Sequence, residues 1–480
     1  MARRVARALA FAIPFAVYAL SAHRHLMYWD MGEFALVPFI AGISHPTGFP
    51  LYIMVGWFFS HAVPLGSVAF RMSLLSGLCV AAAAAFLAAH IDDVTDHPWL
   101  ALSCAGFFAF GDIAWKIATR PDPHAMAILA FTAMVFFLLR WKRTGSPRAL
   151  IAAAFAFGCG VAVHPILLLS TFGLLLLFAT EVHRTQTRTM IQAAGAGFAA
   201  LLAYLYIPLR SLWYNAHPSD PTRFLGLPDG QPFFNYGNPS TPSRLLSYLT
   251  GAEFNVHGGV RAIGSLSGYV AHWSTFAAYA MREWTVFGTA IIVLGVIMLV
   301  QRDALRSIGL LLMVVPCIAF AMNYPGEADR TRYLLPVFVI GIVFAGEYCG
   351  RIVRPVWVAN VAAVAILCVA LGLFLGNSDL FRQSYDRSAS LMVTHVIVHT
   401  QDDGIIIAPW TYATPIAYAA YVGHRLGGRT LVPHWLDDVS DAIPRWLRTR
   451  PVYVLDPQGA SVFGHRLELI DPDVGLYRVF

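Results

Sequence analysis

Long apolar segments recur along the first three quarters of this chain and strongly limit the folds open to it. Hydrophobic residues make up 58% of the 480-residue sequence and charged residues 12%, against roughly 25% charged residues in a typical soluble domain. A helix of about 20 apolar residues spans a lipid bilayer, and these runs are too long for the short strands of a membrane β-barrel. The sequence therefore predicts an α-helical integral membrane protein.

The apolar segments predict about eleven transmembrane helices, several of them shorter than about 20 residues. They cover residues 8–22, 68–89, 99–114, 125–140, 149–163, 166–180, 190–212, 284–300, 307–322, 333–349 and 355–376. We interpret residues 51–63 as a half-buried or surface-lying helix, because an additional span there would break the alternation of loops described next. The basic-then-apolar N-terminus also resembles a signal peptide with a cleavage site near Ala22, but an uncleaved first span is expected because many more spans follow.

The charges in the loops predict the orientation. With a cytoplasmic N-terminus, most of the later inside loops carry an excess of Arg and Lys, as the positive-inside rule requires. These loops cover residues 90–97, 140–148, 181–189, 301–306 and 351–355. The formal charge of +6 thus reflects membrane topology, and we expect no nucleic-acid partner. The six cysteines lie in apolar segments without metal-ligand spacing and predict no disulfide framework.

The same orientation places five segments outside the cytoplasm. They cover residues 22–67, 116–124, 213–283, 323–332 and everything after 376. The tail alternates short strands and helices: strands at 404–410, 429–433 and 451–456, helices at 414–428 and 438–449. This alternation predicts a small extracytoplasmic α/β domain at 377–480, after a transmembrane catalytic domain at 1–376.

The first external loop carries two acids, Asp30 and Glu33, between aromatic and proline residues. Carboxylates are costly at a membrane face unless they meet water or a partner, and a partly desolvated one is suited to general-base chemistry. A solvated loop with a helix-capping acid is the structural alternative. We name Asp30 and Glu33 as candidate catalytic residues.

A rigid turn follows these acids. His45-Pro46 and Gly48-Phe49-Pro50 combine fixed and permissive backbone positions, which would bring His45 back toward Asp30. Pro50 is equally consistent with the start of the next helix. Arg71 lies just inside the following span, where a cation is expected to meet a carboxylate, a phosphate or the interface.

Further polar residues gather at the outer ends of other spans. The short turn around Arg120, Asp122 and His124 could hold a phosphate or simply be a solvated Arg–Asp turn. His164 splits two spans at the same face and has either a binding or a hydrogen-bonding structural role. Candidate donor-binding residues also include Arg210, Arg330 and Arg332.

Several motifs in this order resemble one family. WDMGEF, SHPTGFPLY and AFRMSLLSGL, followed by AWKIATRPDPHAMAI, GVAVHPILLL, LYIPLR and NYGNPSTPSRLLSYLTGAEF, resemble protein O-mannosyltransferase-like membrane enzymes. The plan is also similar to that of the wider GT-C glycosyltransferases, although Thr47 replaces the second proline of their His-Pro-Pro-like turn. The resemblance covers roughly residues 20–255.

The resemblance implies inverting transfer of a sugar, such as mannose, from a polyprenyl-phosphate donor to a hydroxyl of a protein or glycan acceptor. Asp30, or else Glu33, would be the base, and arginines would stabilise the departing lipid phosphate. No metal site is predicted, while a divalent ion stays open. The alternatives are a glycan-modifying or lipid-modifying glycosyltransferase or polymerase, and a lipid-carrier transporter, for which mid-span charges and half-repeats would be expected.

Overall fold

The computed structural model describes the chain except for residues 218–233, 253–265, 325–326, 353–355, 435–438, 440–441 and 457–463. Within it, the chain forms two compact units. Unit 1 comprises Met1–Ala22, Leu74–Tyr204 and Ala252–Arg382, and unit 2 comprises His23–Ser73, Leu205–Gly251 and Gln383–Phe480. These units do not coincide with the predicted division at residue 376, because segments from the first half of the chain join the tail in unit 2.

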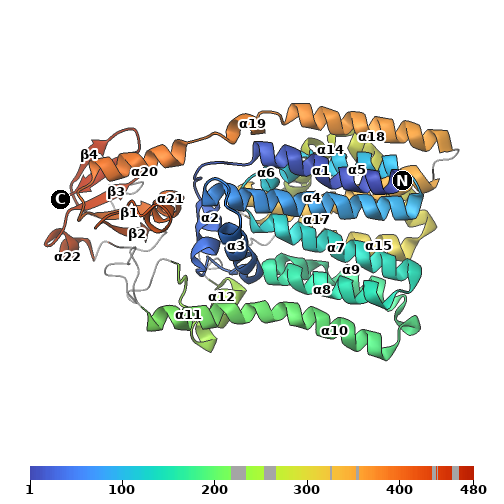
Figure 1. Ribbon diagram of the computed structural model, residues 1–480, viewed down its shortest axis with the longest axis horizontal. Coiled ribbons are helices and arrows are strands. Elements are labelled where there is room, and N and C mark those ends of the chain that lie inside the picture. The colour runs from blue at the N-terminus through green and yellow to red at the C-terminus, as the bar shows by residue number, and fades with distance from the viewer. Residues whose placement is uncertain are drawn as a thin grey trace. The chain divides into compact units, whose positions relative to one another are not determined.

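Unit 1 is helical (Figure 1). Its elements are α1 Ala2–Ser21, α4 Val68–Thr95 (whose first turns belong to unit 2), α5 Pro98–Ala109, α6 Asp112–Ala118, α7 Pro123–Thr144, α8 Pro147–Val163, η1 Pro165–Ser170, α9 Thr171–Ala179, η2 Val182–Arg184, α10 Thr187–Leu201, η3 Leu202–Leu205, α14 Leu266–Arg302, α15 Ala304–Asn323, α16 Glu327–Tyr333, α17 Leu335–Glu347, η4 Tyr348–Ile352, α18 Val356–Gly376 and α19 Leu380–Gln383.

Among the described residues, seven helices are long and apolar enough to cross a bilayer, or eight if one bent pair is a single span. The prediction of a helical integral membrane protein is therefore confirmed. Three further apolar helices of 10–17 residues, Pro147–Val163, Pro165–Ala179 and Leu335–Gly350, lie in predicted spans. They fall short of the ~20 residues that a perpendicular span needs, so the count of eleven stays a prediction.

The bent pair is α5 and α6, which meet at 74°. The apolar segment predicted at 99–114 is therefore broken near Gly111, and its last residues belong to α6. The buried carboxylate of Glu283 accepts hydrogen bonds from the backbone N–H groups of Ile113 and Ala114, at 2.7 and 3.4 Å. It thereby satisfies donors that an α-helix leaves open at its N-terminus.

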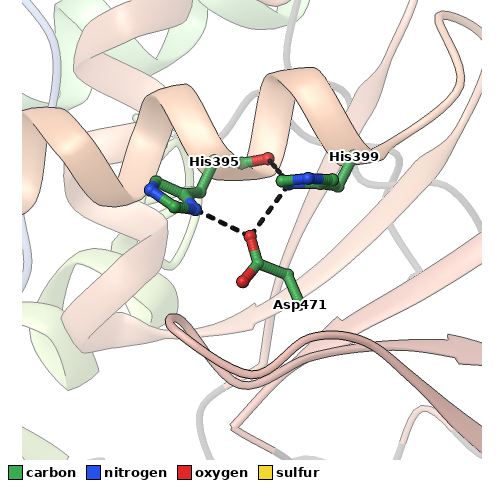
Figure 2. A group of neighbouring side chains, drawn as sticks. All are labelled: His395, His399 and Asp471. Carbon is green, nitrogen blue, oxygen red and sulfur yellow. Dashed lines mark hydrogen bonds and ion pairs between the residues drawn. The ribbon is translucent and has the colours of Figure 1, made fainter.

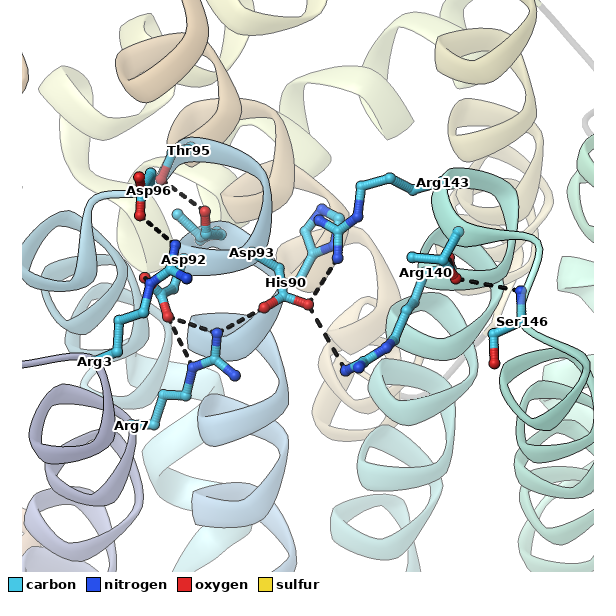
Figure 3. A network of polar contacts seen from close by, with 12 residues as sticks. Arg3, Arg7, His90, Asp92, Asp93, Thr95, Asp96, Arg140, Arg143 and Ser146 are labelled. Atoms are coloured by element: carbon cyan, nitrogen blue, oxygen red, sulfur yellow. Dashed lines mark hydrogen bonds and ion pairs between the residues drawn. The ribbon is translucent and has the colours of Figure 1, made fainter. Parts of the chain in front are cut away.

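Arginines and aspartates tie together one end of unit 1 (Figure 3). Arg7 of α1 contacts Asp92 and Asp93 of α4, each at 2.6 Å, and Arg143 of α7 contacts Asp93 at 2.8 Å. The predicted inside loop 90–97 is in fact mostly the last turns of α4. The segment itself has no net positive charge. Its aspartates are instead paired with arginines of the neighbouring helices α1 and α7.

A second buried ion cluster lies within unit 1. His90 of α4 is 2.8 Å from Glu347 at the end of α17, and Arg306 of α15 donates to the same carboxylate at 2.9 Å. Glu347 is fully buried. A buried carboxylate with an arginine and a histidine around it is satisfied, and removing either partner would leave a buried charge.

Unit 2 contains a mixed five-stranded sheet. Its elements are α2 Asp30–Ile40, α3 Pro50–Ala62, α11 Tyr206–Ala216, α12 Pro242–Thr250, α20 Ser388–His399, β1 Ile405–Pro409, α21 Trp410–Tyr421, β2 Thr430–His434, α22 Ile443–Leu447, β3 Val452–Leu455, β4 Leu467–Asp471 and β5 Leu476–Val479. The strand order is β2-β1-β3-β5-β4, with β1 parallel to β2 and β3, and β5 antiparallel to β3 and β4.

The sequence pattern explains these elements. Buried β-branched residues such as Ile405, Ile407 and Val452 fill one side of the sheet with Trp446 of α22. Strands β1, β2 and β3 lie where apolar runs predicted strands. Helix α3 lies at the segment 51–63, which was predicted as a half-buried or surface-lying helix, and has 13 residues, too few for a ~20-residue span.

Candidate functional site

Asp30 is the first residue of α2 and is half-buried. One of its carboxylate oxygens accepts a hydrogen bond from the indole N–H of Trp410, at 3.1 Å. Trp410 begins α21 directly after β1, at the carboxyl end of a parallel strand, where side chains often form sites in α/β folds. The hydroxyl of Thr414 donates to the carbonyl of Trp29 at 2.7 Å and holds the start of α2 against α21.

Glu33 is one helical turn further and is fully buried. Its carboxylate accepts the backbone N–H of His45 at 2.7 Å and lies 2.5 Å from the His45 ring nitrogen Nδ1. Burial and the charge of Asp30 raise the pKa of Glu33, while the contacts with His45 oppose that rise. Glu33 therefore fixes the turn that carries His45, whereas Asp30 is only half-buried.

Aromatic rings pack around His45. The ring of Trp410 lies 6.4 Å from that of His45 and 6.0 Å from that of Tyr236, both edge to face. The rings of Phe34 and Phe49 lie 5.5 and 5.3 Å from His45 on its other sides. These ring contacts hold His45 in one position.

The predicted rigid turn depends on Gly48, whose φ is +94°. Tyr248 of α12 donates its hydroxyl to the carbonyl of Ser44 at 2.6 Å. A Cβ at position 48 would lie 2.7 Å from that hydroxyl oxygen. Glycine is thus required both for the backbone conformation and for the close approach of α12.

We expect Gly48→Ala to lower the stability of the folded protein by about 1–3 kcal/mol, because alanine at positive φ is strained and its methyl group collides with Tyr248. Thermal unfolding of the detergent-solubilised chain measures this. Gly195→Ala is the control, since nothing lies within 4 Å of a Cβ there, and it should be neutral or slightly stabilising. Equal melting temperatures for the two variants would contradict the prediction.

Two of the predicted donor-binding arginines hold backbone carbonyls. Arg71 donates to the carbonyl of Ser60 in the last turn of α3 at 2.7 Å, and to that of Gly66 beyond the helix at 3.1 Å. Arg210 donates to the carbonyl of Ala41 at 2.6 Å and lies over the ring of Trp213 at 4.1 Å. Both guanidinium groups thus satisfy carbonyls that a helix end leaves open, which is a structural task.

A second polar cluster lies in unit 1 around Asp122. Its fully buried carboxylate caps α7 by accepting the backbone N–H of His124 at 3.0 Å, and it lies 2.8 Å from His124 Nδ1. Arg120 and Arg332 each bring a guanidinium nitrogen to 3.4 Å from its other oxygen. Burial alone would raise the pKa of Asp122, but the charges of Arg332, His124 and Arg120 hold it well below its usual range.

The second ring nitrogen of His124 is available for a ligand. His124 is 4% exposed, and its Nε2 has no hydrogen-bond partner among the described residues. The same side chain lines a small pocket with Arg332, Tyr333 and several apolar residues. Two arginines against one carboxylate leave an excess positive charge beside that pocket, which suits an anionic group on an apolar chain.

The remaining predicted residues have mainly structural contacts. His164 packs 4.8 Å from the ring of His124, and its Nδ1 accepts the backbone N–H of Ile166 at 3.1 Å. Arg330 donates to the carbonyl of Tyr324 at 2.6 Å. Lys116, the first residue of the predicted outer segment 116–124, is in α6 and pairs with Asp112 at 2.7 Å.

Asp30, Glu33 and His45 each offer one ligand atom within 4.8 Å of the others. A carboxylate–carboxylate–imidazole set of this size fits a divalent metal ion. The hydrogen bonds of Glu33 with His45 and of Asp30 with Trp410 also account for this geometry without a metal ion.

Trp410 and Tyr236 were not among the site residues predicted from the sequence. Trp410 is the last residue of the strand predicted at 404–410, and only this position at the carboxyl end of a strand signals a site. Tyr236 stands in a turn-rich motif near Asn235 and Asn238, which hold the turn by hydrogen bonding to Ser211 and Asn215.

Comparison with known proteins identifies the segment that carries Asp30. Residues 30–188 match the family model described as the protein O-mannosyl-transferase TMEM260 N-terminal domain. The protein O-mannosyl-transferase TMEM260 of Mus musculus is 28% identical over 208 residues, which are 42% of this chain and 30% of that protein. The corresponding protein of Dictyostelium discoideum is 28% identical over 127 residues, 26% of this chain and 15% of that one.

The chain thus spans less than a third of the length of these relatives. Over nearly its whole length it has the fold of a solved structure, ArnT from Cupriavidus metallidurans. The match to ArnT bound to undecaprenyl phosphate has a TM-score of 0.62 at 12% identity, and covers 98% of this chain and 97% of that one. ArnT in the apo state gives a TM-score of 0.63 with the same identity and coverage. The resemblance to O-mannosyltransferase-like proteins of GT-C fold is confirmed: residues 30–188 are homologous to the TMEM260 N-terminal domain.

Proposed function

We propose that this protein is an inverting membrane glycosyltransferase that moves a sugar, most simply mannose, from a polyprenyl-phosphate donor to a Ser or Thr hydroxyl. The observation that carries the proposal is Asp30, a half-buried carboxylate held by Trp410 at the first residue of the segment homologous to the TMEM260 N-terminal domain. The fold shared with ArnT, a protein solved with undecaprenyl phosphate bound, supports the donor class.

Asp30 is the proposed base. As the acceptor hydroxyl attacks the anomeric carbon, its proton passes to a carboxylate oxygen of Asp30, and the bond from that carbon to the phosphate oxygen breaks with its electron pair leaving on the lipid phosphate. Glu33 is the weaker candidate, because both of its oxygens already contact His45. Its proposed role is to position the His45 turn beside Asp30.

The cluster around Asp122 in unit 1 is proposed to bind an anionic group such as a lipid phosphate. Arg120 and Arg332 supply the positive charge for that anion. When its imidazole is protonated, His124 holds Asp122 through Nδ1 and donates Nε2–H to a phosphate oxygen. The apolar lining of the adjacent pocket suits the first carbons of a polyprenyl chain.

The proposed orientation has a cytoplasmic N-terminus and an extracytoplasmic C-terminal α/β domain, and transfer occurs on the outer side. The support is the distribution of Arg and Lys between predicted loops. A single cysteine introduced near residue 400 should react with an impermeant reagent from outside the cytoplasm in intact cells. Reaction only from the cytoplasmic side would overturn this orientation.

A transfer assay tests the activity. Membranes containing the protein receive labelled polyprenyl-phosphate mannose and a Ser/Thr-rich peptide, with an Ala-substituted peptide as control. Label on the first peptide alone, together with a hexose lost from exported proteins when the protein is absent, supports the proposal. Label that appears instead on lipid or glycan identifies another acceptor class, and movement of intact donor across the membrane without transfer would favour a lipid carrier.

A further inference from the structure

Two histidines and one aspartate converge at the edge of the sheet in unit 2, and the proposed function does not use them. His395 and His399 are four residues apart on α20, so they share one face of the helix. Asp471 ends β4, far along the chain. Figure 2 shows both imidazole rings directed from α20 toward the same carboxylate.

The donor atoms are close enough to share one ion. The Nδ1 atoms of His395 and His399 lie 2.7 and 2.8 Å from the same oxygen of Asp471. The ligand atoms of all three residues lie within 4.8 Å of one another. Tetrahedral zinc with ligand bonds of about 2.0–2.1 Å needs ligand atoms roughly 3.3 Å apart. An outward movement of about half an ångström would therefore admit the ion.

The local backbone directs Asp471 into this position. The pairing of β4 with β5 is irregular between Leu469 and Asp471, so one additional residue bulges from β4. Bulges of this kind redirect a side chain beside a site. The other oxygen of Asp471 accepts the backbone N–H of Asp473 at 2.9 Å. One oxygen is thus anchored and the other is left facing the two rings.

Burial also fits a metal site with an open entrance. The side chain of Asp471 is 4% exposed, whereas those of His395 and His399 are 35% and 41% exposed. An ion can reach the rings from solvent and meet a buried carboxylate behind them. The rings themselves lie 5.9 Å apart between centroids, tilted by 38°.

We propose that His395, His399 and Asp471 bind one divalent transition-metal ion, with zinc as the best fit, and that the ion fastens α20 to β4. Two imidazoles and one carboxylate suit zinc, cobalt or nickel, whereas magnesium and calcium prefer oxygen ligands. Three protein ligands leave a fourth position for water or another small ligand. The site is independent of the transferase proposal.

The rival account is a hydrogen-bonded contact without metal, in which both rings donate to Asp471 and His399 also contacts the carbonyl of His395 at 3.0 Å. The test uses the full chain in detergent, without a polyhistidine tag and stripped with chelator. Zinc uptake is measured by competition with a chromogenic chelator, and cobalt is added separately to read the coordination geometry from its absorption spectrum.

We expect one zinc ion per chain, a tetrahedral cobalt spectrum and no displacement of zinc by magnesium or calcium. Asp471→Asn, which is close to the native residue in shape, and His395→Ala should each weaken zinc binding at least tenfold. Asp30→Asn should bind zinc normally, because it alters only the other candidate cluster. The proposal is overturned if the wild-type chain takes up no zinc, or if Asp30→Asn loses zinc while Asp471→Asn retains it.

Discussion

Asp30→Asn is expected to lower the rate of sugar transfer by about 10²–10⁴-fold, the range over which a general base contributes. Asparagine cannot take the proton of the acceptor hydroxyl. Its side-chain oxygen can still accept the indole N–H of Trp410, so the contact that orients the side chain is kept. The initial rate of transfer from labelled polyprenyl-phosphate mannose measures the effect, normalised to the amount of folded protein in the membrane.

Trp410→Phe separates proton transfer from positioning. Phenylalanine keeps an aromatic ring beside His45 and Tyr236 but removes the N–H that holds Asp30. We expect a smaller loss than in Asp30→Asn, with most of the effect on kcat, because the carboxylate is still present but less well oriented. Transfer at the wild-type rate by a folded Asp30→Asn chain would exclude Asp30 as the base.

The sequence predicted the broad architecture because its signals are local. Uninterrupted apolar runs of span length define α4, α7 and α15, whose bounds, Val68–Thr95, Pro123–Thr144 and Ala304–Asn323, enclose the predicted segments 68–89, 125–140 and 307–322. Short β-branched runs likewise marked β1 and β3. Such patterns can be recognised from the local sequence alone, without knowing which element each face packs against.

Contacts between distant residues could not be predicted in this way. Trp410 and Asp30 are separated by 380 positions, and no periodicity relates them. The bend between α5 and α6 has no proline to mark it, since it depends on Glu283 meeting the start of α6 from a helix far along the chain. Glu283 stands at the end of the predicted outer segment 213–283, so its position in the sequence does not indicate this contact.

The partners of the predicted arginines could not be identified from the sequence. A cation near a membrane face needs a partner, and Arg71 was expected to meet a carboxylate, a phosphate or the interface. Phosphates and carboxylates were the expected partners, but backbone carbonyls at helix ends satisfy a guanidinium group equally well. Of the predicted cations, Arg120 and Arg332 meet at a shared carboxylate, which is why they remain the candidates for binding an anion.

Asp122→Ala is expected to destabilise unit 1 by about 3–5 kcal/mol, because it leaves buried cations without their counter-charge. Arg332 is 6% exposed and His124 4% exposed, so water cannot replace the carboxylate. The substitution also removes the cap of α7, a contribution of about 1 kcal/mol within that total. Thermal unfolding in detergent should show a large drop in melting temperature or a loss of folded protein.

Asp112→Asn is the matched control. Asp112 also meets two cations, Lys116 at 2.7 Å and Arg282 at 2.9 Å, but these are 38% and 57% exposed. Water screens such pairs, and we expect a loss of about 1 kcal/mol or less. If Asp112→Asn and Asp122→Ala lower stability by similar amounts, burial does not strengthen the ion pairs of Asp122.

The pH dependence of stability provides an independent check on Asp122. Because the pKa of Asp122 is held well below its usual range in the folded chain, its contribution to stability is fully present above the unfolded value of about 3.9. That contribution is lost as the pH falls from there through the lower folded pKa. The difference in stability between the wild-type chain and Asp122→Asn should therefore be constant near neutral pH and shrink below about pH 4. A difference that grows on acidification would mean that the arginines do not hold this carboxylate in its charged form.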